Sequence, residues 1–197
     1  MIDVIEITFE EFKDSIYKEY VELFPIEERR ELTRIKSTYD RGIEKIYKIV
    51  HDNILIGFFM LERIDDSYPF YLDYFAIFKE FQNKGYGTKA LEKLIKKIII
   101  DKEICGEIEK VDLKDAIKLK RFEFYKKLGF EKIDSEYLLF DVIYMPIIRS
   151  KSKNIDKDKM DKIFFDYYKI NSGEKRAKKN CRIIKWFKRK YKFIIKE

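Results

Sequence analysis

The chain has 197 residues, of which 46% are hydrophobic and 40% charged, and its formal net charge is +7. This apolar content is enough for a buried core and excludes a mainly disordered chain. No apolar run approaches the ~20 residues of a membrane-spanning helix, and the start does not resemble a signal peptide, so we expect a cytoplasmic protein. With two cysteines and one histidine, we expect neither a disulfide framework nor a metal site.

The positive charge is concentrated at the C-terminal end of the chain. Residues 174–197 hold eleven Lys and Arg against two Glu, which gives +9 and leaves −2 for residues 1–173. The basic character is therefore a property of the tail rather than of the body. We accordingly expect one domain over residues 1–149 and a C-terminal extension over residues 150–197.

Hydrophobic periodicity predicts the elements of the first half of the chain. The predicted strands cover residues 2–7, 43–50, 54–64 and 70–78, and the predicted helices cover residues 9–20 and 26–35. Thr8 is a candidate N-cap of the first helix, with Glu11 as its capping-box partner. Residues 51–53 would form a hairpin turn between the second and third strands.

The second half continues the alternation of helices and strands. It predicts a helix with its buried face at residues 90–99, a strand at 104–111, a helix at 114–128 and strands at 130–135 and 137–148. The whole order is β-α-α-β-β-β-α-β-α-β-β, an α/β domain with a mixed sheet. In the extension, apolar spacing predicts a helix over 160–170 and a basic amphipathic helix over about 174–191.

The most informative segment is a strand, a two-glycine loop and a helix start between Leu72 and Thr88. Backbone N–H groups at a helix start have no partner inside the helix, and the helix dipole adds positive charge there. Gly85 and Gly87 would let an anion approach the backbone, while Lys84 adds a charge. We expect an anion cradle, most plausibly for a pyrophosphate. The alternative is a plain strand-to-helix turn that uses glycines.

Other phosphate-binding loops fit this segment less well. The P-loop pattern G-x-x-x-x-G-K-[ST] and the His-Arg-Asp stretch of kinases are both absent. A dinucleotide fingerprint would tolerate Ala90 as its third small residue. However, that fingerprint follows the first strand of a βαβ unit, whereas three antiparallel-looking strands precede this loop.

The loop resembles a signature of a known family. Gln82-x-x-Gly85-x-Gly87, after a strand that ends in Ala76 and Ile77, is similar to the coenzyme A signature Arg/Gln-x-x-Gly-x-Gly/Ala of the GNAT N-acetyltransferases. A second segment, Phe-Tyr-Lys-Lys-Leu-Gly-Phe from residue 124, resembles the Phe/Leu-Tyr-x-x-x-Gly-Phe segment of the same family. The predicted element order also matches. The resemblance covers roughly residues 2–149 and implies an acyl-CoA N-acyltransferase fold.

The resemblance implies acetyl-CoA (coenzyme A) as co-substrate. Backbone groups of Phe75, Ala76 and Ile77 would pair with the pantetheine arm like an added strand, and an N–H near Ile77 would polarise the thioester carbonyl. The pyrophosphate would be held by the loop residues Gln82, Asn83, Lys84, Gly85, Tyr86, Gly87 and Thr88.

The resemblance also points to acid and base residues. Tyr125 occupies the general-acid position of the family, and a tyrosine with a pKa near ~10 stays protonated at pH 7. Asp73 and Glu109 are about equal candidates for the base, with Glu107 behind them. Asp73 lies four residues before Ile77, which puts both on one face of a regular strand. The alternative for each carboxylate is a solvated or lysine-paired strand end, and Tyr125 would otherwise pack its ring under the coenzyme.

The resemblance implies an N-acetyltransferase that moves an acetyl group from acetyl-CoA to a primary amine of a small molecule, peptide or protein. The alternative is a non-catalytic coenzyme A-binding module of the same fold that acts through its basic tail. An apolar helical stripe runs along that tail, formed by Ile183, Ile184, Phe187, Tyr191 and Ile194. The stripe would dock on the body or on a second copy, or lie on an anionic membrane, or the tail would bind nucleic-acid phosphates.

Overall fold

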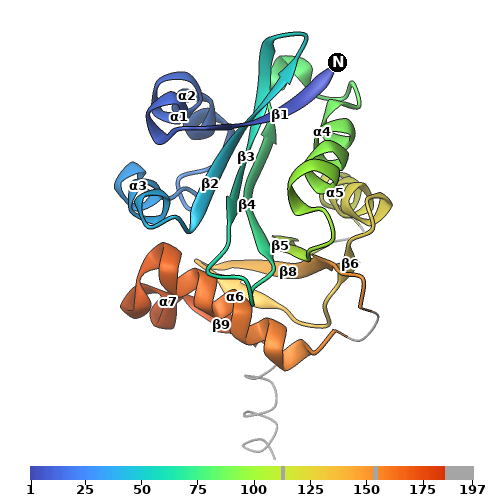
Figure 1. Cartoon of the computed structure of the whole chain (residues 1–197). Coiled ribbons are helices and arrows are strands. Elements are labelled where there is room, and N and C mark those ends of the chain that lie inside the picture. Colours follow the sequence, from blue (N-terminus) through green and yellow to red (C-terminus); the bar gives the residue numbers. More distant parts are fainter. Residues whose placement is uncertain (112–113, 153–154, 185–197) are drawn as a thin grey trace, which may run out of the picture. The chain divides into compact units, whose positions relative to one another are not determined.

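A computed structural model of the chain describes residues 1–111, 114–152 and 155–184. The chain divides into two compact units, residues 1–104 and residues 105–197. Figure 1 follows both units in sequence colours. Among the helices of the described ranges, none combines the length and the apolar character that a membrane span needs.

The first unit is built on four strands that pair antiparallel in chain order. They are β1 (Ile2–Ile7), β2 (Glu44–His51), β3 (Ile54–Glu62) and β4 (Phe70–Ile77). Asp52 and Asn53 adopt φ of 50° and 66° in the turn between β2 and β3, which is the left-handed pair of a tight hairpin. The four predicted strands and the predicted hairpin are therefore confirmed.

Helices cover both faces of this sheet (Figure 1). α1 (Phe9–Ser15), α2 (Tyr17–Leu23) and α3 (Leu32–Asp40) cover one face, and α4 (Tyr86–Leu94) lies on the other. The core under α1 to α3 is rich in aromatic side chains, and its fully buried members include Phe12, Ile16, Tyr20, Ile35, Ile46, Phe58 and Met60. α4 continues into a π-helical turn, η2 (Ile95–Ile99), so the predicted helical face at residues 90–99 is confirmed.

The first predicted helix, residues 9–20, is two helices. Thr8 caps α1 as predicted and accepts the N–H of Glu11 at 3.1 Å. The carboxylate of Glu11 pairs with Lys48 on β2 at 2.5 Å. The chain then bends at Ile16 (φ −122°, ψ −29°), whose side chain is completely buried, before α2 begins.

The second predicted helix, residues 26–35, begins later than the sequence suggested. α3 starts only after Glu31, which has extended backbone angles. In the preceding loop, the N–H of Arg30 donates to the hydroxyls of Tyr20 at 2.7 Å and Tyr74 at 3.2 Å. These side-chain partners replace the helical hydrogen bonds that the prediction assumed.

In the second unit, β8 (Val142–Arg149) pairs antiparallel with both β6 (Glu131–Lys132) and β7 (Tyr137–Leu139). β5 (Ile104–Glu109) neighbours β8, and β7 pairs with β9 (Cys181–Ile183). α5 (Ala116–Lys127) follows β5 in the chain and confirms the helix predicted at 114–128. The predicted strand at 137–148 is instead the hairpin β7–β8, because Phe140 and Asp141 turn the chain at φ of 48° and 70°.

The extension contains the predicted helix at 160–170 as α6 (Lys157–Ser172), which buries Phe164 and Tyr167. The amphipathic helix predicted over about 174–191 is wrong within the described residues. α7 (Glu174–Asn180) ends early and β9 follows, because the edge of β7 offers backbone partners and Cys181 and Ile183 alternate with an exposed arginine. The rest of the predicted apolar stripe lies outside the described residues.

Candidate active site

The two-glycine loop joins β4 to α4. β4 ends at Ile77, a single 3-10 turn, η1 (Lys79–Phe81), follows, and α4 begins directly after Gly85. Residues 82–85 are exposed, and Asn83 and Gly85 have φ of 61° and 77°. The loop therefore crosses the end of the sheet in a tight turn that a glycine adopts without strain.

The N-terminus of α4 is open to an incoming anion. Gly85 is its N-cap, and no described atom lies within 4 Å of a Cβ built on it. Lys89 makes a first helical bond, to the carbonyl of Gly85 at 3.3 Å, so the N–H groups from Tyr86 to Thr88 precede the helical ladder. A phosphate at this position would meet backbone donors and the positive end of the helix dipole.

Two side chains of the loop brace its backbone. The amide nitrogen of Gln82 donates to the carbonyl of Ile77 at 2.8 Å. The Lys84 ammonium donates to the carbonyl of Glu80 at 2.8 Å and lies 5.7 Å from the centre of the Phe81 ring. Because both side chains hold the loop in this way, its backbone N–H groups are the donors best placed for a phosphate.

The end of β4 turns one backbone N–H away from β3. Phe78 donates its N–H to Ile56 at 2.9 Å, and Ile77 is opposite Gly57 in the same ladder. Hydrogen-bonded and non-bonded pairs alternate in an antiparallel ladder, so the N–H and C=O of Ile77 point away from β3. The C=O accepts the Gln82 amide, and the N–H has the direction that the family resemblance expects of a donor to a thioester carbonyl.

A β-bulge on β4 changes the predicted direction of Asp73. The β3–β4 register shifts between Met60 and Leu61, which leaves Asp73 as an extra residue without a partner across the ladder. The Asp73 carboxylate pairs with Arg30 at 2.6 Å. It therefore lies on the face that α1 to α3 cover and not on the face of Ile77. The sequence-based placement is wrong because the alternation of faces fails at a bulge.

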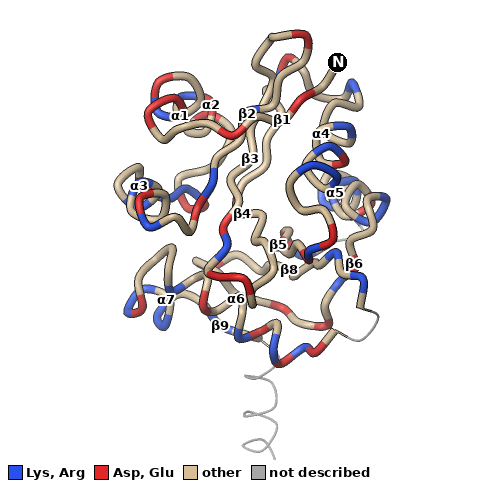
Figure 2. The backbone as a smooth tube through the Cα atoms, in the orientation of Figure 1, with Lys and Arg blue, Asp and Glu red and all other residues tan. Residues whose placement is uncertain are grey.

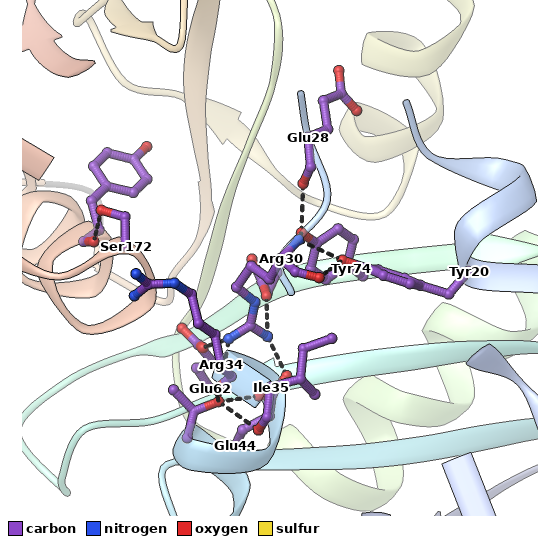
Figure 3. Close-up of polar contacts among 12 residues, drawn as sticks. Tyr20, Glu28, Arg30, Arg34, Ile35, Glu44, Glu62, Tyr74 and Ser172 are labelled. Carbon is purple, nitrogen blue, oxygen red and sulfur yellow. Dashed lines mark hydrogen bonds and ion pairs between the residues drawn. The ribbon is translucent and has the colours of Figure 1, made fainter. Parts of the chain in front are cut away.

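Arg30 pairs with three carboxylates, those of Glu44, Glu62 and Asp73, and we call these four residues the Arg30 cluster. Figure 3 labels Arg30, Glu44 and Glu62. The guanidinium pairs with Glu44, with Glu62 at 2.9 Å and with Asp73 at 2.6 Å. Glu44 and Glu62 are opposite each other on β2 and β3. Oxygens of the three carboxylates lie within 4.8 Å of one another, a spacing that suits a cation, and the guanidinium contacts all three.

The surroundings of Asp73 make it a stronger base than an exposed aspartate. Burial raises the pKa of Asp73 to about 7, with Arg30 opposing the shift and the negative charge of Glu44 adding to it. Burial also raises the pKa of Glu44. A carboxyl group with a pKa near the working pH is suited to proton transfer.

Tyr125 lies on α5 and is half-buried. Its ring contacts Phe124 and Phe130, with centroids 5.0 and 5.3 Å away. Burial raises the pKa of Tyr125 to about 12, the positive charge of Arg121 opposes this, and the negative charge of Glu107 adds to it. The hydroxyl therefore stays protonated at neutral pH and keeps a proton to donate.

Glu109 has the opposite surroundings to Asp73. Its two carboxylate oxygens pair with Lys118 and Arg121 on α5, each at 3.2 Å, and its side chain is 24% exposed. The tube in Figure 2 shows how often Lys and Arg recur along α5. Glu109 thus faces two cations, whereas Asp73 shares one guanidinium with two other carboxylates.

Comparison with known proteins identifies the family. The sequence profile of the acetyltransferase (GNAT) family matches residues 9–130. This chain belongs to the GNAT acetyltransferase family. A solved GNAT-family structure from Bacteroides thetaiotaomicron has a TM-score of 0.72 and 26% identity, covering 87% of this chain and 98% of that one.

Two other proteins are also similar to this chain. YjbC of Bacillus subtilis (strain 168), whose name places it among the acetyltransferases, is 29% identical over 119 residues, which is 60% of this chain and 58% of that relative. A GNAT family acetyltransferase from Elizabethkingia anophelis with acetyl-CoA bound shares the fold, with a TM-score of 0.52 and 17% identity over 76% of this chain and 97% of that one.

GNAT acetyltransferases use acetyl-CoA, and the β4–α4 loop fits its pyrophosphate. The space over Gly85 is clear for 4 Å, and the start of α4 presents backbone donors to it. A side chain at position 85 would fill this space.

The sequence did not reveal Arg30, Glu44 and Glu62 as neighbours of Asp73. The sequence did contain a signal that Glu44 and Glu62 are buried. Each lies two residues from an apolar core residue, Ile46 or Met60, and therefore on the same face of its strand. A charged residue on the apolar face of a strand needs a buried partner of opposite charge. The identity of that partner could not be read from periodicity, since Arg30 comes from a loop.

Proposed function

We propose that the chain is an acetyl-CoA-dependent N-acetyltransferase that acetylates a primary amine of a small molecule, peptide or protein by direct attack of the amine. The observation that carries this proposal is the open N-terminus of α4 beyond the end of β4. Its backbone donors suit the pyrophosphate, and Gly85 leaves the space for it. When bound, acetyl-CoA supplies an acetyl group activated as a thioester.

In this proposal Asp73 is the base. Formation of the new N–C bond requires the amine nitrogen to lose a proton, and most amines are protonated at pH 7. The pKa of Asp73, raised to about 7 mainly by burial, suits a group that takes up this proton at neutral pH. Glu109 is less suited because Lys118 and Arg121 both neutralise its charge.

Tyr125 is the proposed acid. As the C–S bond of the thioester breaks, the sulfur takes the proton of the Tyr125 hydroxyl, which is still bound at pH 7. An ammonium acceptor loses two protons from its nitrogen in each turnover, one to Asp73 before the attack and one to solvent as the amide forms, while Tyr125 gives one proton to the sulfur. Exchange with solvent then restores Asp73 and Tyr125, and one proton is released overall. The products are an N-acetylated amine and free coenzyme A.

Calorimetric titration with acetyl-CoA tests the cofactor site. Gly85→Glu would place a negative side chain in the cradle, and we expect it to weaken binding roughly 100-fold or more, about 2.7 kcal/mol. Gly42→Glu is the matched control, because Gly42 also has positive φ (69°) and clear space around it but lies in the turn after α3. If both variants bind acetyl-CoA equally well, the cofactor does not bind at this loop. If the wild type does not bind acetyl-CoA, the proposed function is overturned.

An acceptor screen tests the transfer itself. Release of the coenzyme A thiol is followed with spermidine, tyramine, a lysine-containing peptide and a peptide with a free α-amino group. We expect at least one primary amine to be acetylated, with the product identified by mass spectrometry. Tight acetyl-CoA binding without transfer to any amine would favour the non-catalytic coenzyme A-binding alternative.

A further inference from the structure

The carboxylates of the Arg30 cluster outnumber its cation. The side chains of Glu44 and Glu62 are 0% exposed and that of Arg30 is 8% exposed. If all three carboxylates were ionised, these four residues together would carry a net charge of −2. Unbalanced charge in a protein interior is costly, so the cluster favours keeping a proton.

Both the backbone and the side chain of Arg30 are held by hydrogen bonds. Its backbone N–H donates to the hydroxyls of Tyr20 and Tyr74 at 2.7 and 3.2 Å, and the Tyr74 hydroxyl donates to the carbonyl of Glu28 at 2.6 Å (Figure 3). Its side-chain Nη1 donates to Glu62 at 2.9 Å. The backbone and the guanidinium of Arg30 are therefore both held by hydrogen bonds to other elements.

Asp73 shares one nitrogen of this guanidinium with Glu44. Nη2 of Arg30 pairs with Oε1 of Glu44 and, at 2.6 Å, with Oδ2 of Asp73. Asp73 therefore receives only part of the stabilisation that a guanidinium of its own would give. Asp73 is also the most exposed of the three carboxylates, at 11%, so it is the member of the cluster through which a proton could be exchanged.

We infer that Arg30 is a positioning residue that fixes Asp73 at the bulge, and that Glu44, by sharing Nη2, keeps Asp73 basic enough to take a proton from the acceptor amine. This inference rests on the proposed function, in which Asp73 is the base. Arg30 and Glu44 do not touch the reacting atoms in this scheme. They act through the position and the charge of Asp73.

The two tyrosines that face Asp73 do not titrate near neutral pH. The titratable groups that face it come from the loop before α3 (Arg30), β2 (Glu44), β3 (Glu62), β4 (Tyr74) and α2 (Tyr20). Burial, reinforced by the charge of Asp73, raises the pKa of Tyr20 to about 12 and that of Tyr74 well above its ordinary value. Both tyrosines therefore keep their protons near pH 7.

Glu44→Gln and Glu62→Gln form a matched pair of variants. Both side chains are completely buried and both pair with Arg30, but only Glu44 shares Nη2 with Asp73. Removing the Glu44 charge leaves Nη2 to Asp73 alone, so we expect the pKa of Asp73 to fall by roughly one pH unit in Glu44→Gln and by less in Glu62→Gln. Arg30→Lys keeps the charge but replaces the planar fork by one ammonium.

The first readout is the carboxyl carbon signal of Asp73, followed by NMR against pH in the full chain without substrate. Asp73→Asn assigns the signal. The second readout is the pH dependence of kcat/KM for acetyl transfer to the best amine of the screen. The rate should rise through the pKa of the base, and in Glu44→Gln this rise should move to lower pH by the same amount as the NMR titration.

Arg30→Lys separates position from charge. We expect kcat to fall roughly 10-fold or more with the KM for acetyl-CoA unchanged, because the carboxylate loses its fixed direction. Arg63→Lys is the control, since Arg63 is similarly covered (17% exposed) and pairs with Asp66 at 2.5 Å. A fall of kcat in Arg63→Lys of the same size would overturn the positioning role of Arg30.

The outcomes distinguish the inference from the proposed function. If the NMR titration gives Asp73 the ordinary pKa of an aspartate, the inference is overturned, whether or not the protein transfers acetyl groups. A second outcome is that the NMR titration of Asp73 is raised and shifts in Glu44→Gln, but the pH dependence of kcat/KM does not shift with it. This outcome also overturns the inference, while the acetyl transfer itself remains established. Absence of transfer to every amine overturns the proposed function, and with it the catalytic role of the cluster, while the NMR titration still reports whether the cluster holds a proton.

Discussion

Asp73 and Glu109 are the two leading candidates for the base, and their surroundings are opposite. Asp73 is buried and shares one guanidinium with two other carboxylates, whereas Glu109 is partly exposed and has two cations to itself. Burial therefore drives Asp73 toward protonation, whereas the carboxylate of Glu109 is ion-paired with two cations. The difference shows that the neighbours of a carboxylate, more than its position on a strand, decide whether it suits proton transfer.

The largest expected effect is the loss of stability when a cation beside Asp73 or beside Glu109 is removed. Arg30→Met would leave three carboxylates buried without a cation, and we expect it to lower the free energy of unfolding by about 3–5 kcal/mol. Arg121→Met removes an exposed cation from Glu109, which keeps Lys118, and we expect a loss below about 1 kcal/mol. Urea denaturation of both variants measures this, and equal losses would show that the two groups are alike.

The pH dependence of stability gives the next largest effect. The folded pKa of Asp73, about 7, lies above its ordinary value of 3.8, so between these pH values the folded state binds the extra proton. Stability is therefore highest at low pH in this window and is lost as the pH rises toward 7. We expect Asp73→Asn to reduce this loss by an amount on the order of 2–4 kcal/mol.

The measurement for this effect is urea denaturation at a series of pH values from 4 to 8. Glu109→Gln serves as the control and should follow the wild-type curve. If Asp73→Asn and wild type show the same slope, Asp73 does not bind a proton in the folded state at neutral pH, and the contrast between the two carboxylates disappears.

The smallest expected effect concerns the proton donor. Tyr125→Phe keeps the ring contacts with Phe124 and Phe130 but removes the hydroxyl, and we expect kcat for acetyl transfer to fall roughly 10- to 100-fold. Acetyl-CoA affinity by calorimetry should change little. An unchanged kcat would remove Tyr125 from the acid role and leave its ring as a packing element.

The sequence was sufficient where local signals decide the structure. The two-glycine loop, the hairpin at Asp52 and Asn53 and the Thr8 cap all depend on residues close together in the chain, and the structure has each of them. The family resemblance rested on the same kind of local motif. These features could be predicted because backbone geometry at glycine, turn and cap residues is set within a few positions.

The sequence was insufficient where a distant partner decides the structure. The bulge at Asp73 depends on the register with β3, and β9 depends on the free edge of β7. Arg30 reaches Glu44 and Glu62 from a loop that was expected to be helical. Periodicity describes one segment at a time, so it gave the strands correctly and the direction of the key carboxylate incorrectly.

The most direct test of the proposed mechanism is the pH profile of acetyl transfer in Asp73→Asn and Glu109→Gln, measured side by side with wild type as kcat/KM for one amine acceptor. We expect Asp73→Asn to lower kcat/KM by roughly 100-fold or more and to remove the rise near pH 7, while Glu109→Gln stays within a few-fold of wild type. Loss of the rise in Glu109→Gln, with Asp73→Asn still showing it, would contradict the assignment of Asp73 as the base.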